Sequence, residues 1–353
     1  MNGALWRTDH LFRLVDDVGI VQHADGTVPK RATGYCVDDV ARLAIVAVGL
    51  DRERRDPACS RVLGSALAFL LHAWDPGPPG MHNLMDYGRR WLDRPHTGDH
   101  LGRAVWALGT VLAQQPPRRE GPACRRLLTA MRPCLEPTES LRETAFVLLG
   151  LARPQDQVVS GLPDLLARLA GRLKTAYDGA QRDGWCWFED RLTYDNARLP
   201  QALIAAGGRL GDEALLRCGL SALDWYAEQC TDGDRIRLVG NRWRPARTGS
   251  AAYEREGDEQ PLDAGALVEA LSEAYRQTGR ADYARGATLA FEWFLGRNTA
   301  GVEVYDFLTG GCHDGLGPDG LNDNEGAEST LAYLQALLAL EEAGIPAVLG
   351  RSA

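Results

Sequence analysis

Apolar residues recur with helical spacing in six segments of the chain, and each segment is apolar on nearly every face. A helix of this kind is normally covered by neighbours on all sides, which predicts six inner helices. The six segments span residues 38–50, 99–113, 140–152, 195–208, 262–275 and 325–344.

Between the inner segments lie helical segments that are apolar on one side only, as expected for an outer layer. Clear examples are residues 57–74, 163–177, 212–229 and 281–297. The link that follows an inner helix is short, whereas the return to the next inner helix is usually long. The long returns are residues 75–98, 178–194, 230–261 and 298–324.

A two-helix unit repeated six times indicates an array that closes on itself. We therefore predict an all-α fold, an (α/α)6 toroid or six-hairpin barrel, formed as a single domain by residues 1–353, with a helix near residues 4–16 completing the outer layer. All inner-helix N-termini then face one end of the ring, beneath the long returns. Long connections in a compact fold are usually functional, which places the expected active site at that end.

Composition narrows the function classes. The 353 residues carry a net charge of −9, and the sequence pI is near 5.4, which argues against a nucleic-acid partner. No apolar run is long enough for a membrane span, and the charged first sixteen residues do not resemble a secretory signal. The eight cysteines are widely spaced without a CxxC pair, as is typical of reduced thiols, so we expect a cytoplasmic protein.

The expected mouth of the ring is rich in carboxylates, aromatic rings and arginine. This combination is typical of a sugar site, because flat rings cover the C–H face of a pyranose while polar groups bind its hydroxyls. The candidate substrate-binding residues are Asp38, Arg90, Trp91, Asp99, His100, Arg103, Trp185, Trp187, Tyr194, Asp195, Asn196, Gln260, Asp263, His313, Asp314 and Glu325.

Glycoside hydrolysis needs one protonated and one ionised carboxyl group. Glu189 is flanked by Trp187 and Phe188, an environment that favours a raised pKa, so we expect it to be the acid. Asp39 or Glu328 is the expected base, because each would start an inner helix elsewhere on the rim.

Several of these residues also have a purely structural interpretation. Asp38, Asp99 and Asp195 could each be a helix N-cap. Glu325 and Glu328 could be first-turn acids that complement the helix dipole, and Trp185 and Trp187 could be core aromatics. The prediction of a site therefore depends on the coincidence of many such residues at one end of the ring.

Histidines are few, and His10, His23, His72 and His96 are expected to be structural or exposed. A minor alternative is a catalytic zinc held by Cys186, Cys312 and His313. The motifs "GWCW" and "GGCHDG" faintly resemble those of lanthionine-synthetase cyclases, which are also α/α toroids.

A broader resemblance covers residues 9 to 342. The chain is similar to a bacterial group of glycosidase-related α/α-toroid proteins associated with glycosyltransferases, through the motifs "GYCVDDVARLAI", "NLMDYGRRWLD", "GDHLGRAVWALG", "WFEDRLTYDNARLPQAL", "DEQPLDAGALVEA" and "GGCHDGLGPDGLNDNEGAESTLAYL". The resemblance implies a carbohydrate-active toroid with site positions at Asp38, Asp39, Asp99, Glu189, Asp195, Gln260, Asp263, Asp314 and Glu328.

The leading prediction is a glycoside hydrolase that acts on an oligo- or polysaccharide through paired carboxylates, with inversion of configuration and without a cofactor or metal. One alternative is a sugar isomerase or epimerase, which would require His100 and His313 to act together in the pocket. The other is a non-catalytic glycan-binding partner of a glycosyltransferase, with a shallow aromatic groove.

Overall fold

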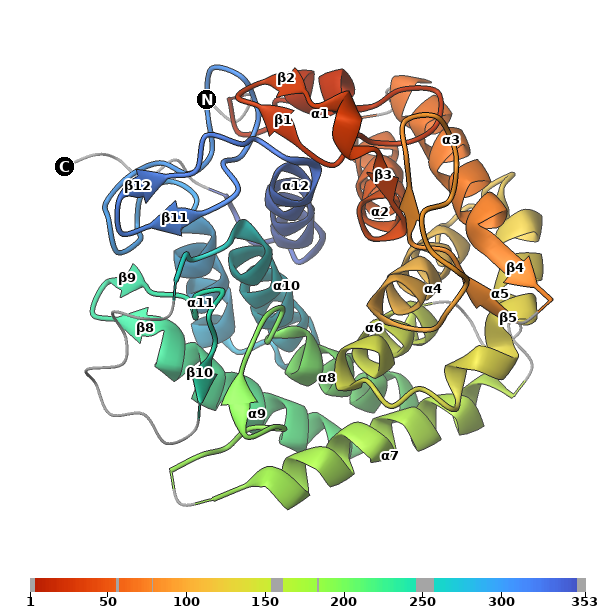
Figure 1. Ribbon diagram of the computed structural model, residues 1–353. Coiled ribbons are helices and arrows are strands. Elements are labelled where there is room, and N and C mark those ends of the chain that lie inside the picture. Colours follow the sequence, from red (N-terminus) through yellow and green to blue (C-terminus); the bar gives the residue numbers. More distant parts are fainter. Residues whose placement is uncertain are drawn as a thin grey trace.

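Six helices form a closed inner ring in the computed structural model, which describes residues 4–54, 57–77, 79–153, 161–182, 184–245 and 257–347 (Figure 1). Each inner helix contacts the next in the sequence, and the last contacts the first. The inner helices are α2 (Val37–Arg54), α4 (Asp99–Leu112), α6 (Leu141–Ala152), α8 (Arg198–Leu210), α10 (Pro261–Thr278) and α12 (Ala327–Glu342).

A second layer of helices surrounds this ring, as Figure 1 shows. Its first member, the short N-terminal helix, packs against α12 and completes the layer. The outer helices are α1 (Asp9–Leu14), α3 (Pro57–Ala73), α5 (Gly121–Leu135), α7 (Leu162–Ala180), α9 (Glu213–Cys230) and α11 (Ala281–Glu292).

The burial pattern explains which helices are inner. Residues 261 to 274 of α10 are all buried, whereas α3 buries one stripe at helical spacing, from Cys59 and Val62 to Ala73. Two glycines let α4 and α6 approach closely. A Cβ on Gly109 would lie 1.9 Å from the carbonyl oxygen of Gly150, so any side chain there would push the two helices apart.

Six two-stranded antiparallel sheets lie in the described parts of the connections. The pairs are β1 (Ala24–Asp25) with β2 (Val28–Pro29), β3 (Tyr35–Cys36) with β6 (Leu84–Met85), β4 (Trp74–Pro76) with β5 (Pro79–Met81), β7 (Arg191–Leu192) with β10 (Arg244–Pro245), β8 (Thr231–Asp232) with β9 (Arg235–Ile236), and β11 (Leu316–Gly317) with β12 (Gly320–Leu321). A 3-10 helix covers Arg31–Thr33. Two of the sheets, β3–β6 and β7–β10, join connections from different helix pairs.

The predicted all-α toroid is therefore confirmed, with helix bounds shifted by a few residues. The N-terminal helix begins at Asp9 rather than near residue 4. Among the inner helices the largest shift at a helix start is in α8, which begins at Arg198 rather than at 195, because Asp195 has a left-handed backbone with φ of 49°. None of the described helices is both long and apolar enough to cross a membrane.

Candidate functional site

A cavity of about 680 Å³ opens at the end of the ring where the inner helices begin. Six carboxylates face it, from Asp38, Asp39, Asp99, Asp258, Asp314 and Glu328, together with one arginine, Arg103. Its remaining lining is mainly polar, and comprises Gln22, His23, Cys36, Asn83, Leu84, His96, Gly98, His100, Tyr194, Asn241, Gln260, Leu262 and Asn322. A hollow of this size and polarity suits a small hydroxylated ligand.

Asp39 and Glu328 share one arginine at the cavity wall. Arg42 donates from Nη1 to Asp39 Oδ1 and from Nη2 to Glu328 Oε2, both at 2.9 Å. The Asp39 side chain is 7% exposed and the Glu328 side chain 39% exposed, so one carboxyl is buried and the other faces solvent. The guanidinium of Arg42 thus binds two carboxyl groups that lie in different environments.

The pKa of Asp39 is raised to about 6. Burial is the main cause, and the negative charges of Glu328 and Asp38 add to it, while Arg42 and the Cys36 thiol act in the opposite direction. The thiol donates to Asp39 Oδ2 at 3.1 Å, and it remains protonated because burial raises the pKa of Cys36 well above its usual value. Asp39 is therefore a carboxyl group that can carry a proton near neutral pH.

Asp38 behaves differently from its neighbour. Burial opposes its ionisation, but Arg103, Arg42 and His100 outweigh burial and lower its pKa. Arg103 donates from Nη1 to Asp38 Oδ1 at 2.6 Å. The two consecutive aspartates thus face one cavity with their pKa values displaced in opposite directions.

A chain of buried ion pairs continues from Asp38 into the ring. Arg103 Nη2 binds Asp195 Oδ2 at 3.0 Å, and Asp195 Oδ1 in turn accepts from Arg198 Nε at 3.1 Å. Arg198 Nη2 then binds Glu269 Oε1 at 2.7 Å. Opposite charges alternate along the whole chain, which offsets the cost of burying each of them. Asp195, whose backbone is left-handed, is thus bound by two arginines.

The N-cap interpretation fails for Asp99 and Asp195. The N-cap of α4 is Gly98 and that of α8 is Ala197, neither with a side-chain cap bond. Asp99 instead accepts from Tyr194 Oη at 2.6 Å, which crosses from the neighbouring return. Asp38 lies in the first turn of α2, where Arg103 and Asn83 bind its two oxygens.

Three histidines line the cavity, and two of them, His23 and His96, were expected to be structural or exposed. His100 Nε2 lies 2.9 Å from the carbonyl oxygen of Met81. A carbonyl can only accept, so Nε2 carries the hydrogen and Nδ1 the lone pair. Burial is the main cause that lowers the pKa of His100, which keeps the ring neutral.

Nine of the residues singled out by the sequence line this cavity: Asp38, Asp39, Asp99, His100, Arg103, Tyr194, Gln260, Asp314 and Glu328. Three others lie buried behind it. Asp195 belongs to the ion-pair chain, and Asn196 donates through its backbone N–H to Asp263 Oδ1 at 3.5 Å. Burial, reinforced by the nearby Asp195, raises the pKa of Asp263 well above its usual range.

The tryptophans lie outside the cavity lining. Trp187 is fully buried and packs against Phe188, Trp225 and Tyr226, and Trp185 packs edge-on against Trp225. Because α9 supplies Trp225 and Tyr226, the aromatic stretch belongs to the outer layer of the core. Its faces are not available to a sugar.

Trp91 and Arg90 also lie away from the cavity lining. The Trp91 ring stacks on His82 with centroids 4.8 Å apart and meets Phe69 edge-on. Arg90 pairs with Asp86 on the surface, where its side chain is 82% exposed. Both residues stabilise the 75–98 return.

Glu189 does not occupy the position expected of the acid. It pairs with Arg142 Nη1 at 2.8 Å, outside the cavity lining. Its aromatic neighbours in the sequence face the core instead of the carboxyl group. Glu189 is therefore separated from the carboxylates that line the cavity.

The predicted zinc set is not assembled. Among the described residues, one group of three or more histidine, cysteine, aspartate or glutamate side chains is close enough to hold a metal, and it contains no cysteine. Cys312 is buried and its thiol points to the carbonyl of His313. The remaining candidates, His313 and Glu325, belong instead to that group, which lies beside the cavity.

Sequence reasoning missed Arg42, His23, His96, Asn83, Asn241 and Asp258. Arg42 had a usable signal, since it stands three residues after Asp39 on an inner helix and therefore on the same face. Asp258 also had one, because it precedes the start of α10 in an acidic run. Asn83 and Asn241 lie inside long returns, where spacing carries no comparable information.

Known proteins resemble this chain in fold but not in sequence. No protein-family model and no curated protein matches the chain. Similar solved structures include a sugar epimerase from a ruminal bacterium, at 12% identity and TM-score 0.75 over 97% of both chains. A cellobiose 2-epimerase from Bacillus thermoamylovorans has 12% identity and TM-score 0.72 over 98% of this chain and 100% of the other. An α-1,6-mannanase from Salegentibacter has 11% identity and TM-score 0.65, over 97% and 98%.

The chain has the (α/α)6 toroid fold. These three similar structures are carbohydrate-processing enzymes, two of them epimerases and one a mannanase, so they carry two kinds of reaction on one fold. At such low identity the fold alone is transferred, so the reaction has to be argued from this chain's own cavity.

Proposed function

We propose that this protein is a glycoside hydrolase in which Asp39 is the general acid and Glu328 the general base. The observation that carries the proposal is the pair of carboxyl groups bound to Arg42 at the cavity wall, one buried with a raised pKa and one exposed. Two carboxyl groups in contrasting environments are what glycoside hydrolysis requires.

The roles follow from these environments. Asp39, with a pKa of about 6, is partly protonated near neutral pH and can give its proton to the leaving glycosidic oxygen, while Glu328 faces the cavity and can take a proton from the attacking water. Asp38 stays ionised beside Arg103, so its negative charge is available to stabilise an oxocarbenium-like transition state. In a similar α-1,6-mannanase, a variant with two consecutive aspartates replaced by asparagine is inactive, which is consistent with a central role for Asp38 and Asp39.

The test is an assay of hydrolysis on a panel of neutral oligosaccharides, in which the reducing ends released are measured. We expect Asp39→Asn and Glu328→Gln each to lower kcat by about 10²–10⁴-fold, the range typical of a positioned acid or base. Glu341→Gln is the matched control, because Glu341 is an exposed acid at the opposite end of the same helix. Unchanged turnover in both cavity variants would exclude the mechanism.

Inversion remains part of the proposal and rests on analogy of fold. Proton NMR of the anomer first released distinguishes it from retention, since an inverting enzyme releases the opposite anomer to that of its substrate.

A sugar epimerase or isomerase is the second candidate, favoured by His100. Its neutral ring presents an unprotonated Nδ1, and the ring of His96 lies 4.4 Å away between centroids. His313, expected to be the second base, is absent from the described cavity lining. The epimerase reaction predicts incorporation of solvent deuterium at a sugar carbon and its loss in His100→Gln, whereas the hydrolase incorporates none at carbon.

A non-catalytic glycan-binding role is less well supported. It calls for an aromatic groove without perturbed carboxyl groups, yet Tyr194 is the one Phe, Tyr or Trp among the described lining residues. The raised pKa of Asp39 also points to chemistry rather than to binding alone.

A further inference from the structure

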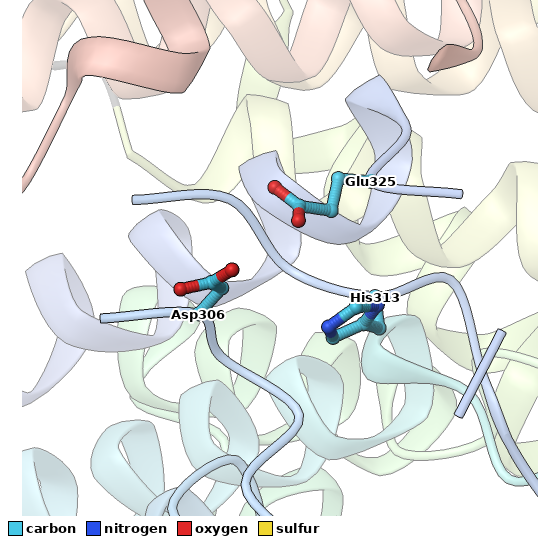
Figure 2. Close-up of side chains that lie close together, drawn as sticks. All are labelled: Asp306, His313 and Glu325. Atoms are coloured by element: carbon cyan, nitrogen blue, oxygen red, sulfur yellow. The ribbon is translucent and has the colours of Figure 1, made fainter. Parts of the chain in front are cut away.

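We propose that the chain binds one divalent transition-metal ion, of the Zn²⁺ class, beside the cavity through His10, Asp306, His313 and Glu325. Figure 2 shows the side chains of Asp306, His313 and Glu325 gathered around a common gap. One possible ligand atom from each lies within 4.8 Å of the others.

His10 lies outside this group of three, next to Glu325, and independent observations suggest it as the fourth ligand. This side chain is fully buried, and its Nδ1 has no hydrogen-bond partner among the described residues. Nδ1 lies 3.9 Å from Glu325 Oε2, so it faces the same carboxylate. A buried nitrogen without a partner is costly, and a bound cation would satisfy it.

The tautomers of both histidines fit metal binding. His10 Nε2 lies 2.7 Å from the carbonyl oxygen of Glu325, and His313 Nδ1 lies 2.8 Å from that of Asn322. Each of these nitrogens must carry the hydrogen, since a carbonyl only accepts. Nδ1 of His10 and Nε2 of His313 therefore present lone pairs, and the backbone carbonyl orients each ring, as is usual for ligating histidines.

The surroundings of the Glu325 and Asp306 carboxylates also favour a bound cation. Glu325 is 3% exposed, and no lysine or arginine in the described part of the chain forms an ion pair with it. Thr309 Oγ1 donates to Glu325 Oε2 at 2.8 Å, and the backbone N–H of Leu308 donates to Asp306 Oδ1 at 2.6 Å. Gly311 makes room, because a Cβ there would lie 1.9 Å from Glu325 Oε2.

Charge and size favour the Zn²⁺ class. Two carboxylates and two neutral imidazoles balance a charge of +2, which lowers the cost of burying the ion. Tetrahedral zinc with bonds of about 2.0–2.1 Å places ligand atoms about 3.4 Å apart. The ligand atoms of Asp306, His313 and Glu325, which lie within 4.8 Å of one another, would therefore have to close by up to about 1.4 Å on binding.

The location gives the ion a role. His10 belongs to α1, Asp306 and His313 to the 298–324 return, and Glu325 to the residues before α12. The ion would join the outer helix α1 to the start of the last inner helix, α12. Asp314, which lines the cavity, accepts from the backbone N–H of Gly326 and follows His313 directly, so this joint also fixes one cavity wall.

The experiment is a titration of chelator-treated full-length protein with Zn²⁺ and with Co²⁺. We expect one ion per chain, an intense visible Co²⁺ spectrum typical of tetrahedral sites, and a rise in Tm with metal. His313→Gln and Asp306→Asn, both at partly exposed positions, should each weaken binding on the order of 100-fold and abolish that spectrum.

His82→Gln is the matched control, because His82 also donates to a backbone carbonyl and lies 3.9 Å from a carboxylate, that of Asp93. It should bind metal like the wild type. The proposal would be overturned if the protein bound no stoichiometric metal, or if all three variants bound it with equal affinity. It would also be overturned if Tm changed with pH but not with added metal, because His10 and Glu325 would then share a proton instead of binding an ion. None of these readouts depends on turnover, so failure here is distinct from failure of the hydrolase mechanism.

Discussion

The two ends of the ring carry opposite charge. Six carboxylates and one arginine line the cavity where the inner helices begin. At the other end, where those helices finish, a hollow of about 570 Å³ is lined by four arginines and two glutamates, namely Arg52, Arg153, Arg209, Arg276, Glu273 and Glu342. Helix dipoles are positive at N-termini and negative at C-termini, so each end carries the charge that complements its dipoles.

The helix dipoles explain the sign of the charge at each end of the ring. They do not explain why the carboxyl groups of only one end would be reactive. At the far end, Arg276 pairs with both Glu273 and Glu342, at 3.3 Å each. At the cavity end, burial keeps Asp39 partly protonated although Arg42 is bound to it. The difference between the ends is thus the environment of individual acids, and the following predictions test it.

The largest effect is expected from the buried ion-pair chain. Arg198→Met would leave Glu269 buried without its cation and would leave Asp195 with Arg103 alone, which should lower the free energy of unfolding by about 3–5 kcal/mol. Arg276→Met at the far end removes a cation that is 36% exposed, and should cost only about 0–1 kcal/mol. Urea denaturation of the two variants measures both values. Equal losses would mean that the two ends do not differ in this respect.

The pH dependence of stability should follow the raised pKa of Asp39. The native carboxyl has a pKa of about 6 against 3.8 for an ordinary aspartate, so between these values the native state binds more protons than the unfolded state. Stability from this group is therefore present at low pH and is lost as pH rises through 6. Its size is about 3 kcal/mol, at about 1.4 kcal/mol per pKa unit.

Asp39→Asn removes this contribution. The difference in unfolding free energy between wild type and variant should fall as pH rises from about 4 to about 6 and then level off, as followed by urea denaturation across that range. For the control Glu341→Gln, the difference in unfolding free energy from the wild type should not fall between about pH 4 and about pH 6. A flat difference for Asp39→Asn would contradict the raised pKa.

The next largest effect should be the preference of the cavity for neutral over anionic sugars. An anionic sugar such as a uronate meets six carboxylates and one arginine in the cavity, and like charges in contact cost several kcal/mol. We expect a uronate-containing oligosaccharide to bind at least about 10-fold more weakly than its neutral counterpart in calorimetric titration, with the gap narrowing at high salt. Tighter binding of the uronate would mean that the arginine-lined end takes the ligand.

The sequence predicted the ring well because periodicity is a local signal. Helices that are apolar all round must be covered by neighbours, and six of them with short links close in few ways. The acidic mouth also followed, since residues such as Asp39, Asp99 and Glu328 stand at helix starts.

Side-chain direction could not be predicted in the same way. Trp187 and Glu189 lie in one short stretch, but Trp225 on α9 draws the ring of Trp187 into the core and Arg142 on α6 binds the carboxylate of Glu189. Glu328 meets Arg42 across 286 positions, the difference between 328 and 42. Such partners come from other helices, and spacing within one segment holds no information about them.

The smallest effect is expected from Glu342→Gln at the far end. Burial opposes the ionisation of Glu342, but Arg153, Arg276 and Arg52 outweigh it and lower its pKa, so its contribution to stability is present above the unfolded pKa and is lost as pH falls. This sign is opposite to that of Asp39. Because Glu342 is partly exposed, its loss should cost less than about 1 kcal/mol and leave kcat unchanged. If turnover fell as far as we expect for Asp39→Asn, removing a carboxylate at either end would impair activity, and the distinct environment of Asp39 would no longer explain the effect of its substitution.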